Sequence, residues 1–96
     1  MLKIDKNLNG RSLRISLAGE IDSVTAPEFD REVQDMENVD EVTLDLKDLS
    51  YTSSAGLRVL LRLKRRLAQR PLRLENIGIE VREVLDMTGS SALLGL

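Results

Sequence analysis

The sequence predicts an α/β protein: one domain over residues 1–96, with a mixed four-stranded sheet in the order β-β-α-β-α-β-α and helices packed on the sheet. Alternating apolar and polar residues on each side of Asn9-Gly10 predict a β-hairpin. After the hairpin, segments with helical spacing of apolar residues alternate with strand-like segments, as in proteins with parallel strand pairs. Hydrophobic residues make up 42% of the chain and charged residues 31%, which is typical of a soluble globular protein.

The first two strands are expected over residues 2–8 and 13–17, where apolar and polar residues alternate. Asparagine and glycine tolerate the positive φ angles that a type I′ turn requires. Asn9-Gly10 should therefore join the two strands in an antiparallel pair.

A helix is expected next, over Ala26–Glu37. Thr25 and Glu28 have the spacing of a capping box, and Pro27 falls in the first turn, where proline is tolerated. One face of this helix is apolar and the other is acidic, and we interpret the acidic face as solvated surface.

Residues 42–47 alternate as a third strand, and Asp48–Thr52 is expected to connect it to a helix over Ala55–Gln69, which Pro71 ends. Four arginines share the outer face of this helix: Arg58, Arg62, Arg65 and Arg66. The stripe contains no aromatic residue and the chain has a net charge of -2, so we expect no direct binding to nucleic acid.

The C-terminal part should supply the last strand and helix. Residues 72–74 form a short strand, and the strand-helix-strand order implies a parallel pair with a right-handed crossover. A third helix is expected from Ile77 to about Met87, with Gly89 just beyond its end and Ser90–Leu96 as an apolar tail.

The composition limits the chemistry. The chain has no cysteine and no histidine, which excludes disulfides, thiolate zinc sites and a Ser-His-Asp triad, and no nucleotide-binding glycine motif is present. We therefore expect no metal and no cofactor. An enzyme would need paired carboxylates, and Asp22 with Asp45 or Asp48 is the set that strand ends could supply.

No signal-peptide core and no run of about 18 apolar residues is present. A cytoplasmic protein without membrane insertion is the expectation.

Ser53 and Ser54 lie where the third strand gives way to the second helix. The simplest interpretation is that one hydroxyl caps the helix. A second interpretation uses the same position, because a phosphate is well placed beside the positive end of a helix dipole. Phosphorylation there would change a binding surface without unfolding the helix.

Two segments resemble the STAS-domain anti-sigma factor antagonists, and the resemblance covers nearly the whole chain. Residues 19–26, GEIDSVTA, are similar to the family's G-E-[LI]-D-x-x-[TN]-A segment. Residues 49–61, LSYTSSAGLRVLL, are similar to its L-x-[FY]-x-D-S-[ST]-G-L-x-x-L-L segment. The predicted order of elements agrees with the fold of this family.

The resemblance implies a function in partner switching. The unmodified protein would bind an anti-sigma factor that is also a serine kinase, and so release a sigma factor. Ser54 would be the phosphoacceptor, and a PP2C-type phosphatase would reverse the modification. Asp22, Ser53, Ala55 and Gly56 would belong to the surface that binds the kinase, with Asp22 in contact with the kinase or its nucleotide. The alternative for Asp22 is a structural Asp in a turn before a helix.

One difference from the family pattern keeps an alternative open. Ser53 replaces the aspartate that precedes the acceptor, and Ala55 follows it. Ser53 and Thr52 are therefore alternative acceptors. The chain could also be a STAS adaptor that is not phosphorylated, such as a small subunit of a transporter ATPase or a signalling complex.

Overall fold

The computed structural model describes residues 1–96 and contains one four-stranded sheet in the order β1-β2-β3-β4. Strand β1 is antiparallel to β2, whereas β2, β3 and β4 are parallel, which confirms the predicted mixed sheet. The elements are β1 (Leu2–Asn9), β2 (Ser12–Ile21), α1 (Ala26–Glu32), β3 (Glu41–Thr52), α2 (Ser54–Leu67), β4 (Leu72–Glu75), α3 (Ile79–Met87) and α4 (Ser90–Leu93).

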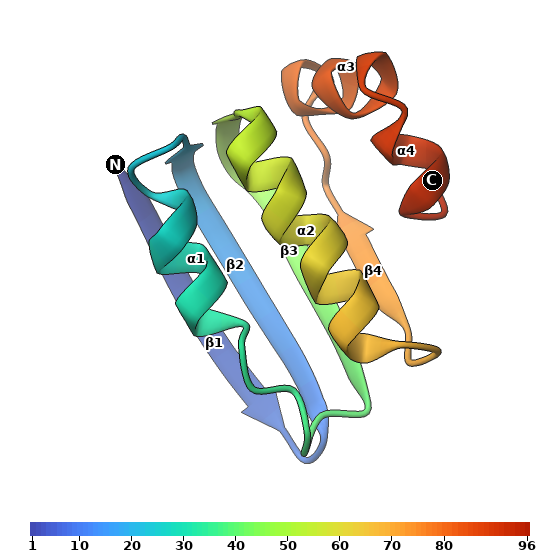
Figure 1. Cartoon of the computed structure of the whole chain (residues 1–96). Coiled ribbons are helices and arrows are strands. Elements are labelled where there is room, and N and C mark those ends of the chain that lie inside the picture. Colours follow the sequence, from blue (N-terminus) through green and yellow to red (C-terminus); the bar gives the residue numbers. More distant parts are fainter.

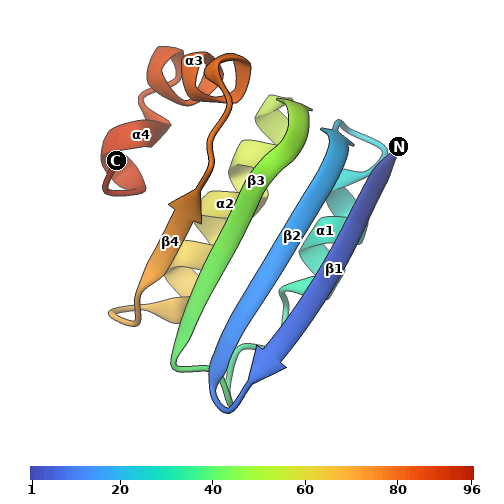
Figure 2. The ribbon, with the colours of Figure 1, turned by 180° about the vertical axis from the view of Figure 1, so that it is seen from behind.

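Helices α1 and α2 lie side by side on one face of the sheet (Figure 1), and no helix covers the other face (Figure 2). Helices α3 and α4 follow β4 at the side of the sheet. The core lies between the sheet and the helices, where Ile15, Val42 and Leu44 of the strands join Phe29 and Leu63, all fully buried. None of the helices combines the length and the apolar character that crossing a bilayer requires.

The hairpin turn differs in detail from the prediction. Asn9 pairs with Ser12, so the two loop residues are Gly10 and Arg11. Gly10 has φ 63°, whereas Asn9 and Arg11 do not have positive φ. Positive φ at only the first loop residue is the condition for a type II′ turn, and the predicted type I′ turn was wrong.

Helix α1 ends at Glu32, five residues before its predicted end. Arginines of α2 hold the segment that follows: Arg66 donates to the carbonyl of Val33 (3.1 Å), and Arg70 donates to the carbonyls of Met36 and Val39. Met36 is still buried, but on an irregular segment. Side chains distant in sequence satisfy these carbonyls, so the helix does not need to continue.

Strand β3 runs on to Thr52, and the prediction that Asp48–Thr52 is a connection was wrong. Its register with β2 shifts twice, once between Ser16 and Ala18 and once between Gly19 and Glu20. Such bulges interrupt the two-residue alternation that identifies a strand in sequence.

The helix boundaries shift by small amounts. Helix α2 starts at Ser54 and ends where Ala68 takes φ 56°, ahead of Pro71. Helix α3 starts at Ile79 rather than Ile77. Gly89 has φ 74°, as expected just beyond a helix end, and part of the predicted tail forms α4.

Candidate phosphorylation and partner-binding site

The candidate site lies at the carboxyl ends of β2 and β3. Ile21 pairs with Thr52, and the N–H of Ser53 donates to the carbonyl of Ile21 (2.8 Å). The turn that contains Asp22 is therefore next to the start of α2. Helices α1 and α2 both begin at the end of the sheet where β2 and β3 finish (Figure 1). The two segments of the STAS-like pattern meet here.

The Asp22 carboxylate holds its own turn. Its Oδ1 accepts hydrogen bonds from the N–H groups of Val24 and Thr25, both at 2.9 Å. The N–H bonds of Thr25 and Val24 favour the charged form and lower the pKa of Asp22. This geometry is that of an Asx turn, which accounts for Asp22 structurally and leaves Oδ2 for another group.

Thr25 does not form the predicted capping box. Its hydroxyl accepts from the N–H of Asp22 (2.9 Å) and lies 3.1 Å from the carbonyl of Glu20, and α1 has no side-chain cap. Thr25 is buried, so its hydroxyl is committed to the turn.

The three neighbouring hydroxyl groups differ in accessibility. Thr52 is 1% exposed, and its hydroxyl donates to the carbonyl of Ser53 (3.2 Å). The Oγ of Ser53 is buried without a hydrogen-bond partner. Ser54 is exposed and makes no side-chain hydrogen bond to the protein. Of the three, only the Ser54 residue lies open to solvent.

Neither serine caps α2. Ser53 occupies the N-cap position with φ -87° and ψ 175°, but its side chain makes no capping bond, so the capping interpretation was wrong. The first hydrogen bond within α2 joins the N–H of Leu57 to the carbonyl of Ser53. The N–H groups of residues 54–56 have no protein partner, and they form the positive end of a 14-residue helix.

Gly56 sets the distance between α2 and the sheet. A Cβ atom at this position would lie 2.3 Å from the Oγ1 of Thr52 and 2.7 Å from the Cγ2 of Ile21. Only glycine allows this approach. Gly56 is buried and Ala55 is half-buried, so the role that the structure shows for Gly56 is to position the start of α2.

Sequence patterns did not identify three exposed apolar side chains. Val24 is 75% exposed in the turn after β2, Tyr51 is 46% exposed near the end of β3, and Ile79 is 79% exposed at the start of α3. Val24 belongs to no helix or strand, and Tyr51 precedes Thr52, whose side chain faces α2, so Tyr51 points to the uncovered face of the sheet. Of the three, Val24 lies in the turn that the Asp22 carboxylate holds.

The carboxylates of the enzyme hypothesis are not close together. Asp45 pairs with Ser16 and Asp48 with Ala18, six and four residues before Asp22, which at strand rise gives separations of about 20 Å and about 13 Å. Asp45 binds Asn76 (3.0 Å) and Arg14 (3.1 Å), and the hydrogen bond from Asn76 is the largest contribution to its lowered pKa. No group of three acidic residues gathers as a metal site.

Comparison with known proteins identifies the family. A family model described as "Mlab, STAS domain" matches residues 4–95. The anti-sigma-B factor antagonist of Bacillus subtilis (strain 168) is 26% identical over 98 residues, which cover 99% of this chain and 90% of that protein.

Solved structures show the same fold. An anti-sigma factor antagonist from Mycobacterium paratuberculosis aligns with a TM-score of 0.87 and 21% identity, over 97% of this chain and 82% of that one. The Bacillus cell fate determinant SpoIIAA in its phosphorylated form aligns with a TM-score of 0.76 and 20% identity, over 97% of this chain and 86% of that one.

Proposed function

The chain belongs to the STAS domain family, and on this basis we propose that it is an anti-sigma factor antagonist controlled by phosphorylation of Ser54. Its unphosphorylated form binds an anti-sigma factor that is also a serine kinase, and so releases a sigma factor. A PP2C-type phosphatase returns the modified protein to this form. The proposal places these events in the cytoplasm and includes no direct contact with nucleic acid.

The accessibility of Ser54 carries the proposal. Ser54 is exposed at the start of α2, while the two alternative acceptors beside it have their hydroxyls inside the fold. A phosphate there would bring a charge of about -1.5 to -2 next to the unpaired N–H groups of the first helical turn. Helix α2 tolerates this charge, so the modification acts on the partner rather than on the fold.

The kinase would recognise the surface around Ser54. Asp22 lies in the adjoining turn with the exposed Val24, and Ser53 and Ala55 lie at the helix start. A dianion in the centre of this surface would have to be desolvated on binding and would repel acidic groups of the partner. Phosphorylation therefore ends the complex.

Incubation with the kinase of its own organism and ATP tests the acceptor. We expect mass spectrometry to show one added phosphate, which is lost in Ser54→Ala and kept in the matched control Ser53→Ala. Full labelling of Ser54→Ala would place the acceptor elsewhere.

A second function is a STAS adaptor that is not phosphorylated, for example in a transporter ATPase or signalling complex. The observation that favours it is Ser53 in place of the family's aspartate, which leaves no carboxylate directly before Ser54. Mass spectrometry of the protein isolated from its own cells separates the two. An abundant phosphorylated fraction is incompatible with this adaptor.

A further inference from the structure

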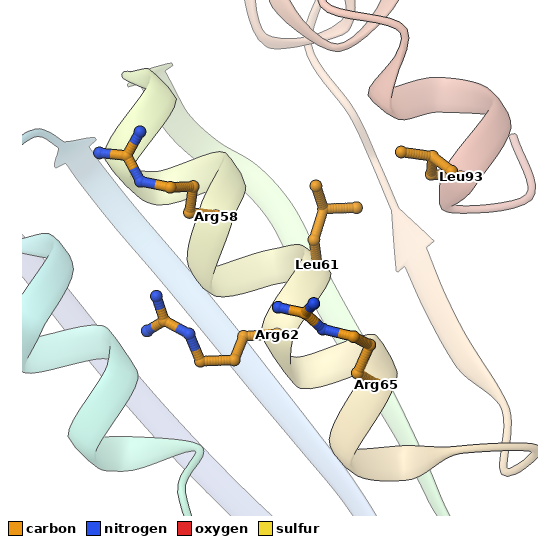
Figure 3. A pocket seen from close by; sticks show the side chains of 5 residues that line it. All are labelled: Arg58, Leu61, Arg62, Arg65 and Leu93. Carbon is orange, nitrogen blue, oxygen red and sulfur yellow. The ribbon is translucent and has the colours of Figure 1, made fainter.

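A groove of about 350 Å³ lies between α2 and α4. Arg58, Leu61, Arg62 and Arg65 line it from α2, and Leu93 lines it from α4 (Figure 3). The three arginines lie along the same helix, and Leu61 and Leu93 point toward each other across the groove.

The positive charge of the groove is largely uncompensated. Arg62 forms an ion pair with Asp30 (3.0 Å), but Arg58 and Arg65 are exposed and take part in none of the ion pairs of the molecule. No acidic residue occurs between Arg58 and Arg73, and none occurs in the segment that carries α4, residues 87–96. The groove therefore attracts carboxylates and offers none of its own.

Two leucine side chains give the groove an apolar part as well. Leu93 is 60% exposed and Leu61 is half-buried. Side chains of this size gain free energy when a partner covers them, and cations beside them fix the orientation of that partner. Leu61 and Leu93 lie on the α4 side of the groove, whereas the side chains of Arg58 and Arg62 extend toward α1 (Figure 3). This lining matches a segment with an apolar stripe and acids beside it.

We propose that this groove docks an acidic amphipathic helix of a partner protein. An apolar side chain of that helix lies between Leu61 and Leu93, and its carboxylates pair with Arg58 and Arg65. The lining contains no aromatic ring for stacking a base, and the groove between two helices is concave, which suits a helix better than a flat lipid surface. This surface does not require that Ser54 is phosphorylated.

A labelled synthetic helix with a leucine stripe flanked by glutamates is a suitable probe. We expect fluorescence anisotropy to show binding that weakens at high salt, and NMR to show shifts in the methyl signals of Leu61 and Leu93. The double variant Arg58→Ala/Arg65→Ala should lose about fivefold in affinity, the effect of removing two exposed ion pairs.

The matched control removes two arginines from elsewhere. The variant Arg11→Ala/Arg73→Ala removes two exposed arginines, which pair with Asp40 and Glu41 respectively. Its affinity for the probe should stay at the wild-type level. Circular dichroism verifies that both double variants are folded. The proposal is overturned if both double variants lose affinity equally, or if a probe with lysines in place of the glutamates binds as well.

Two further results would also overturn it. One is binding to vesicles of anionic phospholipid that depends on Arg58 and Arg65 while the acidic probe does not bind. The other is self-association that the Arg58→Ala/Arg65→Ala variant abolishes, because a second copy of the chain would then be the occupant.

Discussion

Gly56 connects the sequence pattern to the geometry of the site. It is the glycine of the segment that resembles the STAS family, and the structure gives the physical requirement: α2 packs so close to Thr52 and Ile21 that no Cβ fits. Because Ser54 lies two residues earlier on the same helix, the position of the proposed acceptor depends on this contact.

Gly56→Ala should lower the free energy of unfolding. Overpacking costs about 1–3 kcal/mol, which exceeds the gain in helix propensity of about 1 kcal/mol. The matched control is Gly78→Ala at the N-cap of α3, where a Cβ meets nothing within 4 Å. Alanine caps a helix less well than glycine but lowers the entropy of the unfolded chain, and because these effects oppose each other the stability should change by less than about 0.5 kcal/mol. Urea titration measures both. Equal stability of the two variants would contradict the close contact.

Asp22 has a structural role that a variant can separate from a role in binding. Asp22→Asn keeps an oxygen that accepts from Val24 and Thr25, whereas Asp22→Ala does not. We expect a lower thermal midpoint for the alanine variant and a midpoint near wild type for the asparagine variant. The affinity of the Asp22→Asn variant for the kinase then tests the role in binding. Reduced affinity of the folded variant shows that the kinase interacts with the negative charge of Asp22. Unchanged affinity shows that Asp22 only stabilises the turn.

Helix α2 combines the proposed acceptor with the basic groove. Ser54 lies in its first turn and Arg58 one turn later, so a negative charge at residue 54 gains from the helix dipole and from an (i, i+4) arginine. The same element can therefore accept the modification and remain folded.

Ser54→Asp should leave the protein as stable as wild type or raise its stability by about 0.5–1 kcal/mol. Ser54→Lys, the matched control of opposite charge, should lower it. Thermal unfolding at low salt measures the difference, and screening by added salt should reduce it. A Ser54→Asp protein that is as unstable as Ser54→Lys would contradict the proposed tolerance for charge.

Elements that follow local patterns were predictable, and elements shaped by distant contacts were not. The hairpin, the parallel pair of β3 with β4, and α2 follow from alternation, helical spacing and element order. The end of β3 was missed because two bulges interrupt its alternation. The end of α1 was missed because Arg66 and Arg70, more than 30 residues away, bind the carbonyls that follow it.

The site was partly predictable for the same reason. Local sequence placed Ser54 at a helix start and Asp22 in a turn. The accessibility of three adjacent hydroxyls depends on how α2 packs on the ends of β2 and β3, and sequence gives no measure of that packing. The basic groove depends on α4, which the sequence pattern did not reveal as a helix.

Ion pairs connect neighbouring elements across the whole molecule. Asp30 on α1 binds Arg62 and Arg66 on α2, each at 3.0 Å. Burial of Asp30 opposes its charge, but the hydrogen bonds from Arg66 and Arg62 outweigh this effect and lower its pKa. On the uncovered face of the sheet, Arg14 bridges Asp45 and Glu75.

These lowered pKa values predict acid sensitivity. The unfolded chain binds protons to Asp22, Asp30 and Asp45 more readily than the folded protein does. The contribution of these carboxylates to the free energy of unfolding is therefore complete above about pH 4, and it is lost as the pH drops through their folded pKa values. Urea midpoints should decrease between about pH 5 and pH 2, and the decrease should be smaller in Asp30→Asn. An equal decrease in Asp30→Asn would contradict the contribution of the α1–α2 ion pairs.

The central claim is that phosphate on Ser54 changes binding and not folding. Its most direct test is isothermal titration calorimetry of the anti-sigma factor kinase with the unmodified protein and with protein phosphorylated at Ser54, alongside circular dichroism of both forms. We predict that the unmodified form binds, that the phosphorylated form loses at least about tenfold in affinity, and that their spectra and thermal midpoints agree. Equal affinity of the two forms, or loss of affinity together with loss of the fold, would contradict the claim.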